Sequence, residues 1–168
     1  FPVCGIDTFV QTTVPYCVNQ ALPTPGCAGQ TYFDTNPYYY RFTCYSGGTL
    51  EFLLTPDNQQ EDYDWQIFDI TGKNPDDIFT DATSFLVANW AGTYGNTGTS
   101  VTALNSIECG SDPFQIPAVS PFSKSPVLIE GHTYLLMISH FSQTPNGYQL
   151  SFGGGTASIT DPITPALS

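Results

Sequence analysis

Acidic side chains concentrate in the stretch from Asp57 to Asp81. It holds seven aspartates and one glutamate, eight of the fifteen acidic residues, against a single Lys73. A protein-bound calcium ion takes about six to eight oxygen ligands, many of them carboxylates. Four carboxylates lie close together where a turn leads into an expected strand: Asp57, Glu61, Asp62 and Asp64. The sequence leaves two interpretations open, a calcium site formed by these four residues or a solvated acidic loop.

A second candidate site combines aromatic and short polar side chains. A tryptophan and a tyrosine enter a glycine-rich loop, in the run Trp90-Ala91-Gly92-Thr93-Tyr94-Gly95-Asn96. Flat aromatic rings beside polar groups can stack on sugar rings, so Trp90, Tyr94 and Asn96 are predicted ligand-binding residues with a glycan as the ligand class. The alternative is packing in a core or on a sheet face, to which Trp65 is assigned.

Catalytic chemistry has little support. The chain has two histidines, and none of the motifs Gly-x-Ser-x-Gly, His-Glu-x-x-His or a glycine-rich loop carrying lysine occurs. His140, at the end of an expected strand, is the better functional candidate of the two and joins the predicted ligand-binding residues. We predict that the protein is not an enzyme.

The charge balance excludes several partners. Three basic residues against fifteen acidic ones give a net charge of −12. Nucleic-acid binding and attachment to anionic membranes both need clustered lysine and arginine, so neither is expected. No apolar run approaches the about 20 residues of a membrane-spanning helix. We expect a secreted protein whose signal peptide was removed before Phe1.

The cysteines favour an oxidising compartment. Three of the five, Cys4, Cys17 and Cys27, crowd an N-terminal segment rich in proline and glycine that has little core of its own. Disulfides commonly hold such segments in place. Many pairings are open; Cys4–Cys17 is the first choice, and the unpaired cysteine is interpreted as a buried thiol.

The expected elements are mostly strands. Aromatic and β-branched runs bounded by turn residues predict strands at 38–43, 49–54, 63–68, 84–90, 127–129, 132–139 and 148–152, and a short helix within 76–83. Alternation in the third of these strands places Tyr63, Trp65 and Ile67 on one face. Gly47-Gly48 predicts a hairpin between the first two strands. Residues 91–126 are expected to form a long surface loop, where binding commonly takes place.

Together these elements predict one all-β domain, a jelly-roll-like sandwich. We expect an irregular, disulfide-bearing segment over residues 1–30 packed on the domain. The sandwich itself is expected over 31–153. A tail rich in glycine, threonine and proline, over 154–168, is predicted to be a linker.

A series of motifs runs through nearly the whole chain. It includes Pro15-Tyr16-Cys17, Asn36-Pro37-Tyr38-Tyr39-Tyr40, Asp62-Tyr63-Asp64-Trp65-Gln66-Ile67-Phe68-Asp69, Gly131-His132-Thr133-Tyr134 and Phe152-Gly153-Gly154-Gly155-Thr156. In this order the motifs resemble an extracellular module of large gliding-motility and type IX secretion-associated surface proteins of Bacteroidetes bacteria. The resemblance implies a secreted cell-surface β-sandwich in or beside an adhesin-like protein, in a family mostly without an assigned biochemical activity.

A weaker likeness rests on Asp62-Tyr63-Asp64-Trp65-Gln66-Ile67 and Ser139-His140-Phe141-Ser142. Their order is similar to that of CUB and pre-peptidase C-terminal-like sandwiches, which implies a CUB-like jelly roll. Calcium-binding CUB modules carry three acids, and the resemblance matches Asp64 to the second and Asp57 or Glu61 to the first. His140 stands at the position of the third, and histidine is a poor ligand for a hard cation.

The sequence therefore predicts a non-catalytic, secreted module of a bacterial cell surface that acts in adhesion or ligand binding. Its expected partner is a glycan or another cell-surface ligand, and Ca²⁺ is the predicted cofactor of the 57–64 loop. The alternative is a structural module or filament subunit that binds only neighbouring modules of the same assembly. A secreted hydrolase is a distant third possibility.

Overall fold

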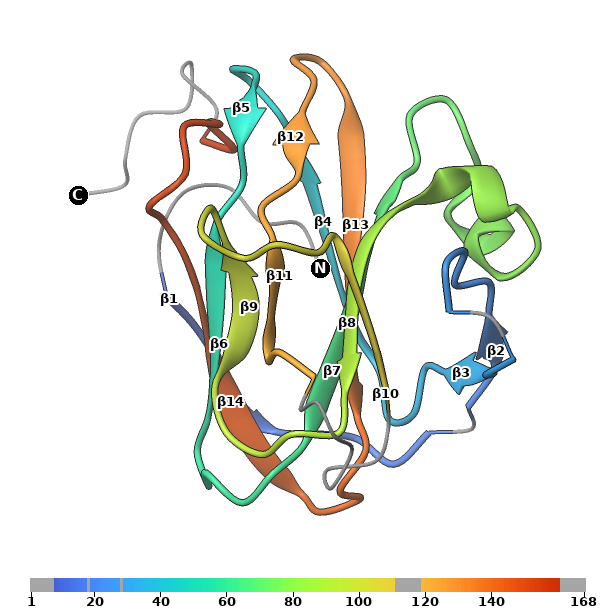
Figure 1. Ribbon diagram of the computed structural model, residues 1–168, viewed down its shortest axis with the longest axis vertical. Coiled ribbons are helices and arrows are strands. Elements are labelled where there is room, and N and C mark those ends of the chain that lie inside the picture. The colour runs from blue at the N-terminus through green and yellow to red at the C-terminus, as the bar shows by residue number, and fades with distance from the viewer. Residues whose placement is uncertain (1–7, 18, 28, 111–118, 161–168) are drawn as a thin grey trace.

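The computed structural model describes residues 8–17, 19–27, 29–110 and 119–160, and shows two five-stranded sheets packed face to face (Figure 1). We call them sheet A, with the strand order β10-β8-β7-β13-β4, and sheet B, with the order β1-β14-β6-β9-β11. The predicted all-β sandwich is confirmed. No helix in the described ranges is long and apolar enough to cross a membrane.

Most strand pairs in both sheets are antiparallel. Sheet A contains β4 (Tyr38–Thr43), β7 (Tyr63–Asp69), β8 (Phe85–Ala91), β10 (Ile107–Gly110) and β13 (Thr133–His140). Sheet B contains β1 (Thr8–Thr13), β6 (Phe52–Pro56), β9 (Thr97–Ser100), β11 (Phe122–Lys124) and β14 (Asn146–Phe152). The edge strands β10 and β11 are parallel to their neighbours β8 and β9.

Four further short strands and two short helices complete the fold. Two small antiparallel pairs lie outside the main sheets: β2 (Ala21–Leu22) with β3 (Tyr32–Phe33), and β5 (Gly48–Thr49) with β12 (Val127–Leu128). Two 3₁₀ helices, η1 (Pro75–Phe79) and η2 (Ala82–Ser84), connect β7 to β8 and fulfil the prediction of a short helix there.

The main core lies between the two sheets. Successive side chains of a strand point to opposite faces, and on β7 this alternation buries Tyr63, Trp65 and Ile67 in the interior, as predicted. The indole nitrogen of Trp65 donates a hydrogen bond to the hydroxyl of Thr97 at 2.9 Å, which satisfies its polar atom inside the core.

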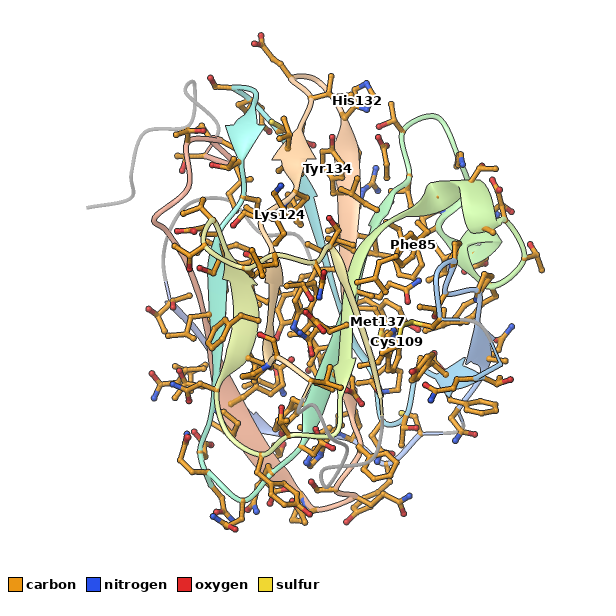
Figure 2. The ribbon with its side chains drawn as sticks, viewed as in Figure 1. Phe85, Cys109, Lys124, His132, Tyr134 and Met137 are labelled. Atoms are coloured by element: carbon orange, nitrogen blue, oxygen red, sulfur yellow. A yellow bond between two sulfur atoms is a disulfide. The ribbon has the colours of Figure 1, made fainter. Side chains whose placement is uncertain are left out.

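A second core covers the outer face of sheet A. Leu22, Cys27 and Tyr32, from the N-terminal segment, pack there against residues of the sheet such as Trp90 and Met137. In Figure 1 the β2–β3 pair lies beside sheet A, on the side away from sheet B. Figure 2 labels Met137 and Cys109 on the side of sheet A that faces the β2–β3 pair. Strands β7 and β13 are consequently buried on both faces.

A disulfide holds the N-terminal segment to the sheet. It joins Cys27 to Cys109 on β10, 82 residues apart. The expected Cys4–Cys17 bond is not formed, because Cys17 is an exposed free thiol; Cys4 itself lies outside the described residues. Cys44 is a buried free thiol, as expected for an unpaired cysteine, and its Sγ donates to the carbonyl oxygen of Ser46.

The predicted Gly47-Gly48 hairpin is wrong. β4 pairs with β13 at the edge of sheet A, whereas the chain after Gly48 crosses over and enters sheet B as β6. The single strand expected at 49–54 is accordingly divided between β5 and β6. The partners of these strands, β13 and β14, are distant in sequence, and a local turn signal carries no information about them.

Segments predicted to be irregular also contribute strands. The expected loop at 91–126 contains β9, β10 and β11, although 111–118 lie outside the described residues. The N-terminal segment supplies β1, which pairs with β14. Short strands rich in threonine and glycine lack the apolar alternation that marks a longer strand, so the sequence pattern missed them.

The C-terminal stretch predicted to be a linker is packed on the sandwich over its described part. Ile159 is buried in the main core, and the amide of Ala157 donates to the carbonyl oxygen of Thr49 at 2.9 Å. The domain therefore extends at least to residue 159 instead of ending at 153.

We predict that the Cys27–Cys109 bond stabilises the domain strongly. The Cys27→Ser/Cys109→Ser double variant should lose about 3–5 kcal/mol of unfolding free energy, because the bond closes a long loop in the unfolded chain. Urea unfolding followed by tryptophan fluorescence measures the loss. Cys17→Ser, which removes an exposed free thiol, is the matched control and should unfold like the parent. Equal midpoints for the double variant and the control would contradict the prediction.

Candidate functional site

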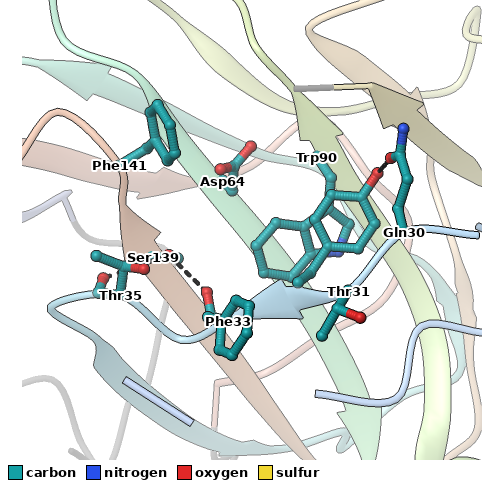
Figure 3. Close-up of a pocket in the computed structure, with 9 residues that line it drawn as sticks. Gln30, Thr31, Phe33, Thr35, Asp64, Trp90, Ser139 and Phe141 are labelled. Carbon is teal, nitrogen blue, oxygen red and sulfur yellow. Dashed lines mark hydrogen bonds between the residues drawn. The ribbon is translucent and has the colours of Figure 1, made fainter. Parts of the chain in front are cut away.

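A pocket of about 290 Å³ lies where the β3 segment meets the outer face of sheet A (Figure 3). Residues of β3 and its flanks form one wall, and residues of β7, β8 and the end of β13 form the other. The lining residues are Gln30, Thr31, Tyr32, Phe33, Thr35, Asp64, Trp90, Ser139 and Phe141.

Sheet register brings the polar floor of the pocket together. Asp64 is paired with Ser139 on β13, and the pairing of Trp65 with Asn89 places Trp90 beside Asp64 on the other side. The three side chains thus form one row across the outer face of sheet A. The alternation that turns Tyr63 toward the core turns Asp64 outward to the pocket.

Aromatic rings form the walls. Trp90 stacks on Tyr32 with ring centroids 4.6 Å apart, and its indole nitrogen donates to Gln66 Oε1 at 3.2 Å. These contacts fix the inner wall. Phe33 and Phe141 are 41% and 56% exposed, so each leaves part of its phenyl ring open to a ligand at the rim.

The β3 wall is fastened directly to the sheet. The Ser139 hydroxyl lies within hydrogen-bond distance of the carbonyl oxygens of Phe33 and Thr35, at 3.1 and 3.3 Å. The backbone amide of His140 also donates to the Thr35 carbonyl oxygen at 2.8 Å. These contacts fix the position of the β3 wall relative to sheet A.

Two buried carboxyl groups are the chemically unusual feature of this face. Asp62 and Asp64 are only 4% and 8% exposed, and Oδ1 of each has no hydrogen-bond partner among the described residues. Burial raises the pKa of Asp62 to about 7. Burial, together with the negative charge of Asp62, raises the pKa of Asp64 well above its ordinary value. Of the two acids, Asp64 lines the pocket, and a strongly perturbed acid in a pocket is typical of functional sites.

Glu61 faces the other way, into the end of the sandwich. It accepts hydrogen bonds from His140 Nε2 at 2.9 Å, from the Thr144 hydroxyl at 2.9 Å and from Asn146 Nδ2 at 2.5 Å. Burial opposes ionisation, but the hydrogen bonds from Asn146, His140 and Thr144 outweigh it and hold the pKa of Glu61 below its ordinary value. This carboxylate joins the start of β7 to the end of β13 and the start of β14.

The four predicted calcium ligands do not form one cluster. Glu61 points into the sandwich, Asp62 and Asp64 point to the outer face, and Asp57 is exposed on the turn after β6. Over the described ranges, no three histidine, cysteine or acidic side chains come together in an arrangement that could hold a metal ion. Calcium binding stays a prediction, and the structure brings together two of its four residues.

Of the predicted ligand-binding residues, Trp90 alone lines the pocket. Tyr94 is 58% exposed, and Asn96 accepts a hydrogen bond from Gln59 Nε2 at 3.1 Å. His140 is buried, stacked on Tyr63 with ring centroids 4.2 Å apart and bonded to Glu61.

The sequence reasoning missed most of the pocket. Its other aromatic residues, Tyr32, Phe33 and Phe141, lie outside the strands that the sequence predicted. Two signals found part of it: the acidic cluster identified Asp64, and the aromatic and glycine-rich run that begins at Trp90 identified Trp90.

The fold and the pocket define a disulfide-linked all-β sandwich with a small aromatic and acidic pocket on the outer face of one sheet. No protein-family model, curated protein or solved structure matches the chain. The resemblance to gliding-motility surface modules stays a prediction, and the function is inferred from the pocket itself.

We predict that loss of the Glu61 charge destabilises the domain. Glu61→Gln replaces a carboxylate that three donors surround, so unfolding free energy at pH 7 should fall by about 2–4 kcal/mol. The folded pKa lies below the ordinary value of 4.5, so this stabilisation is present above that pH and is lost as pH falls through the folded pKa. Urea unfolding between pH 3 and 8 measures it, and equal stability of variant and parent at pH 7 would contradict it. Asp57→Asn, an exposed acid nearby, is the control and should change little.

Removal of the Asp62 charge should have the opposite effect on stability from removal of the Glu61 charge. The folded pKa of Asp62 is about 7, above its ordinary value of 3.8, so the folded state binds the extra proton and loses stability as pH rises between these values. Asp62→Asn should therefore raise unfolding free energy at pH 8, with each pKa unit worth about 1.4 kcal/mol, and should have little effect near pH 3. The same urea titrations measure this, and a variant less stable than the parent at pH 8 would disprove it.

Proposed function

We propose that this domain is a non-catalytic, extracellular ligand-binding module that takes a carbohydrate into the pocket between β3 and sheet A. One observation carries the proposal: Asp64, a carboxyl residue only 8% exposed whose Oδ1 has no hydrogen-bond partner among the described residues, lines a cavity flanked by aromatic rings. A largely desolvated carboxyl group without a paired cation is unfavourable, so its position at a cavity supports contact with a polar group of a ligand.

The lining suits a sugar. The partly exposed phenyl rings of Phe33 and Phe141 offer apolar faces to the C–H groups of a pyranose ring, while Asp64 and the side chains of Gln30 and Thr31 offer hydrogen bonds to its hydroxyls. A small cavity with aromatic walls and few polar groups is the usual form of a small-molecule site. The volume of about 290 Å³ fits roughly one monosaccharide unit.

The setting supports an extracellular role. The Cys27–Cys109 disulfide fits an oxidising environment, and the net charge of −12 disfavours anionic partners. The resemblance to Bacteroidetes surface modules suggests adhesion as the biological use of the binding. A structural subunit that binds only its neighbours is the alternative, and would have no need of a monosaccharide-sized pocket.

The proposal predicts that binding depends on the pocket and not on the glycine-rich loop. A glycan array, run with calcium and again with EDTA, should show capture of a defined set of glycans by the parent protein. Asp64→Asn and Phe141→Ala should each weaken capture by about tenfold or more, since each removes a direct contact. Tyr94→Ala, which removes an equally exposed aromatic ring from the loop, is the matched control and should bind normally.

Three outcomes would count against this function. A silent array in both conditions, with the protein folded, would favour the structural subunit. Loss of capture in Tyr94→Ala but not in Phe141→Ala would move the site to the loop. Capture that needs calcium and is unaffected by Asp64→Asn would place the ligand elsewhere on the domain.

A further inference from the structure

We infer that the ligand of this pocket carries a primary ammonium group that binds Asp64, with Asp62 supplying a second negative charge beside it. On the carbohydrate-binding function proposed above, on which this inference rests, the ligand is an amino sugar with a free amine.

The two carboxyl groups have no counter-charge within the described residues. The chain has three lysine and arginine residues. Lys73 is paired with Asp81 at 2.8 Å, and Arg41 and Lys124 are exposed on β4 and β11. Both histidines already have acidic partners, since His132 contacts Asp69 and His140 contacts Glu61. Buried acids are normally paired with a cation, and here no residue that the structure describes supplies one.

The geometry of the pocket suits an ammonium group. Such a group has three donors and no acceptor. The Asp64 carboxyl lines the pocket, and Ser139 lies in the same pocket with its hydroxyl hydrogen turned toward the carbonyl oxygens of Phe33 and Thr35, which leaves a lone pair free. Figure 3 shows the Asp64 carboxyl between Phe141 and Trp90, and aromatic rings attract cations.

Binding of an ammonium group should release a proton from the pair of Asp62 and Asp64. Without a ligand, the raised pKa values keep at least part of this pair protonated at neutral pH. The titratable groups that face Asp64 are Asp62, which directly precedes β7, and the Tyr32 phenol on β3. The neighbouring residues of β8 and β13, Trp90 and Ser139, carry no charge. A bound ammonium favours the ionised carboxylate, so binding releases a proton to the solvent.

The rim favours an amino sugar over a lysine side chain. Gln30, Thr31 and Thr35 surround the opening with groups that can hydrogen-bond to hydroxyls, and Phe33 and Phe141 provide ring faces wide enough for a pyranose. A lysine side chain offers neither hydroxyls nor a ring, so it would leave these groups unused.

Three trisaccharides that share the same β-1,4-linked sugar chain test the preference for an amine. Calorimetry at pH 6.5 compares β-1,4-linked triglucosamine, its fully N-acetylated form and cellotriose, which differ only in carrying an ammonium, an acetamide or a hydroxyl at C2. The amine should bind at least about tenfold more tightly than the other two. Its binding heat should depend on the ionisation enthalpy of the buffer, as expected for proton release.

Variants make the test specific. Asp64→Asn, checked for an unchanged fold, should abolish the preference for the amine, whereas Asp57→Asn, an exposed acid outside the pocket, should keep it. Binding should also weaken as pH is lowered from 6.5 to 4.5, because protonation of the pair competes with the ammonium.

The possible failures are distinguishable. Equal binding of all three sugars, or the same preference in Asp64→Asn, would overturn the amine assignment and leave the carbohydrate function intact. Absence of binding to any sugar would overturn both. Binding of Nα-acetyl-lysine methylamide as tight as that of the amino sugar would overturn the assignment in favour of a lysine side chain. A calcium-dependent gain for cellotriose that Asp64→Asn removes would show that the pair binds a metal ion instead.

Discussion

Burial of sheet A on both faces is the constraint on which the rest of the structure depends. One face packs on sheet B, and the other presents Phe68, Ala88 and Met137, which are too apolar to leave in water. The N-terminal segment must therefore cover them, although it has few core residues of its own. The disulfide from Cys27 compensates for this by tying the cover to the sheet. The pocket lies where that cover is incomplete.

The two-residue period of a strand divides one acidic cluster into two environments. Glu61 faces the interior and is surrounded by donors, so its charge stabilises the fold. Asp62 and Asp64 face the other side, lack such donors, and favour the protonated state. A chain under selection for stability alone would have little reason to keep the second pair, and acids that oppose stability are commonly retained for function.

The sequence predicted the strands with strong alternation but not their partners. β4, β7, β8, β13 and β14 lie where aromatic and β-branched runs predicted them. The hairpin at Gly47-Gly48 failed because pairing across the sandwich is decided by burial of distant residues, which a local turn signal does not record. The pairing of Cys27 with Cys109 and the assembly of the pocket from separate segments are equally non-local. Asp64 and Trp90 were both predicted to be site residues, but as parts of two separate sites, and the other residues of the pocket were not predicted.

The attachment of the N-terminal cover links the pocket to the redox state of Cys27 and Cys109. Tyr32 and Phe33 form one wall of the pocket, and they belong to the same covering segment as Cys27. Reduction of the bond removes the covalent tie of this wall and leaves the hydrogen bonds from Ser139 and His140 to hold it on the sheet. The wall of the pocket is thus held more loosely where thiols are kept reduced, and more firmly where they are oxidised.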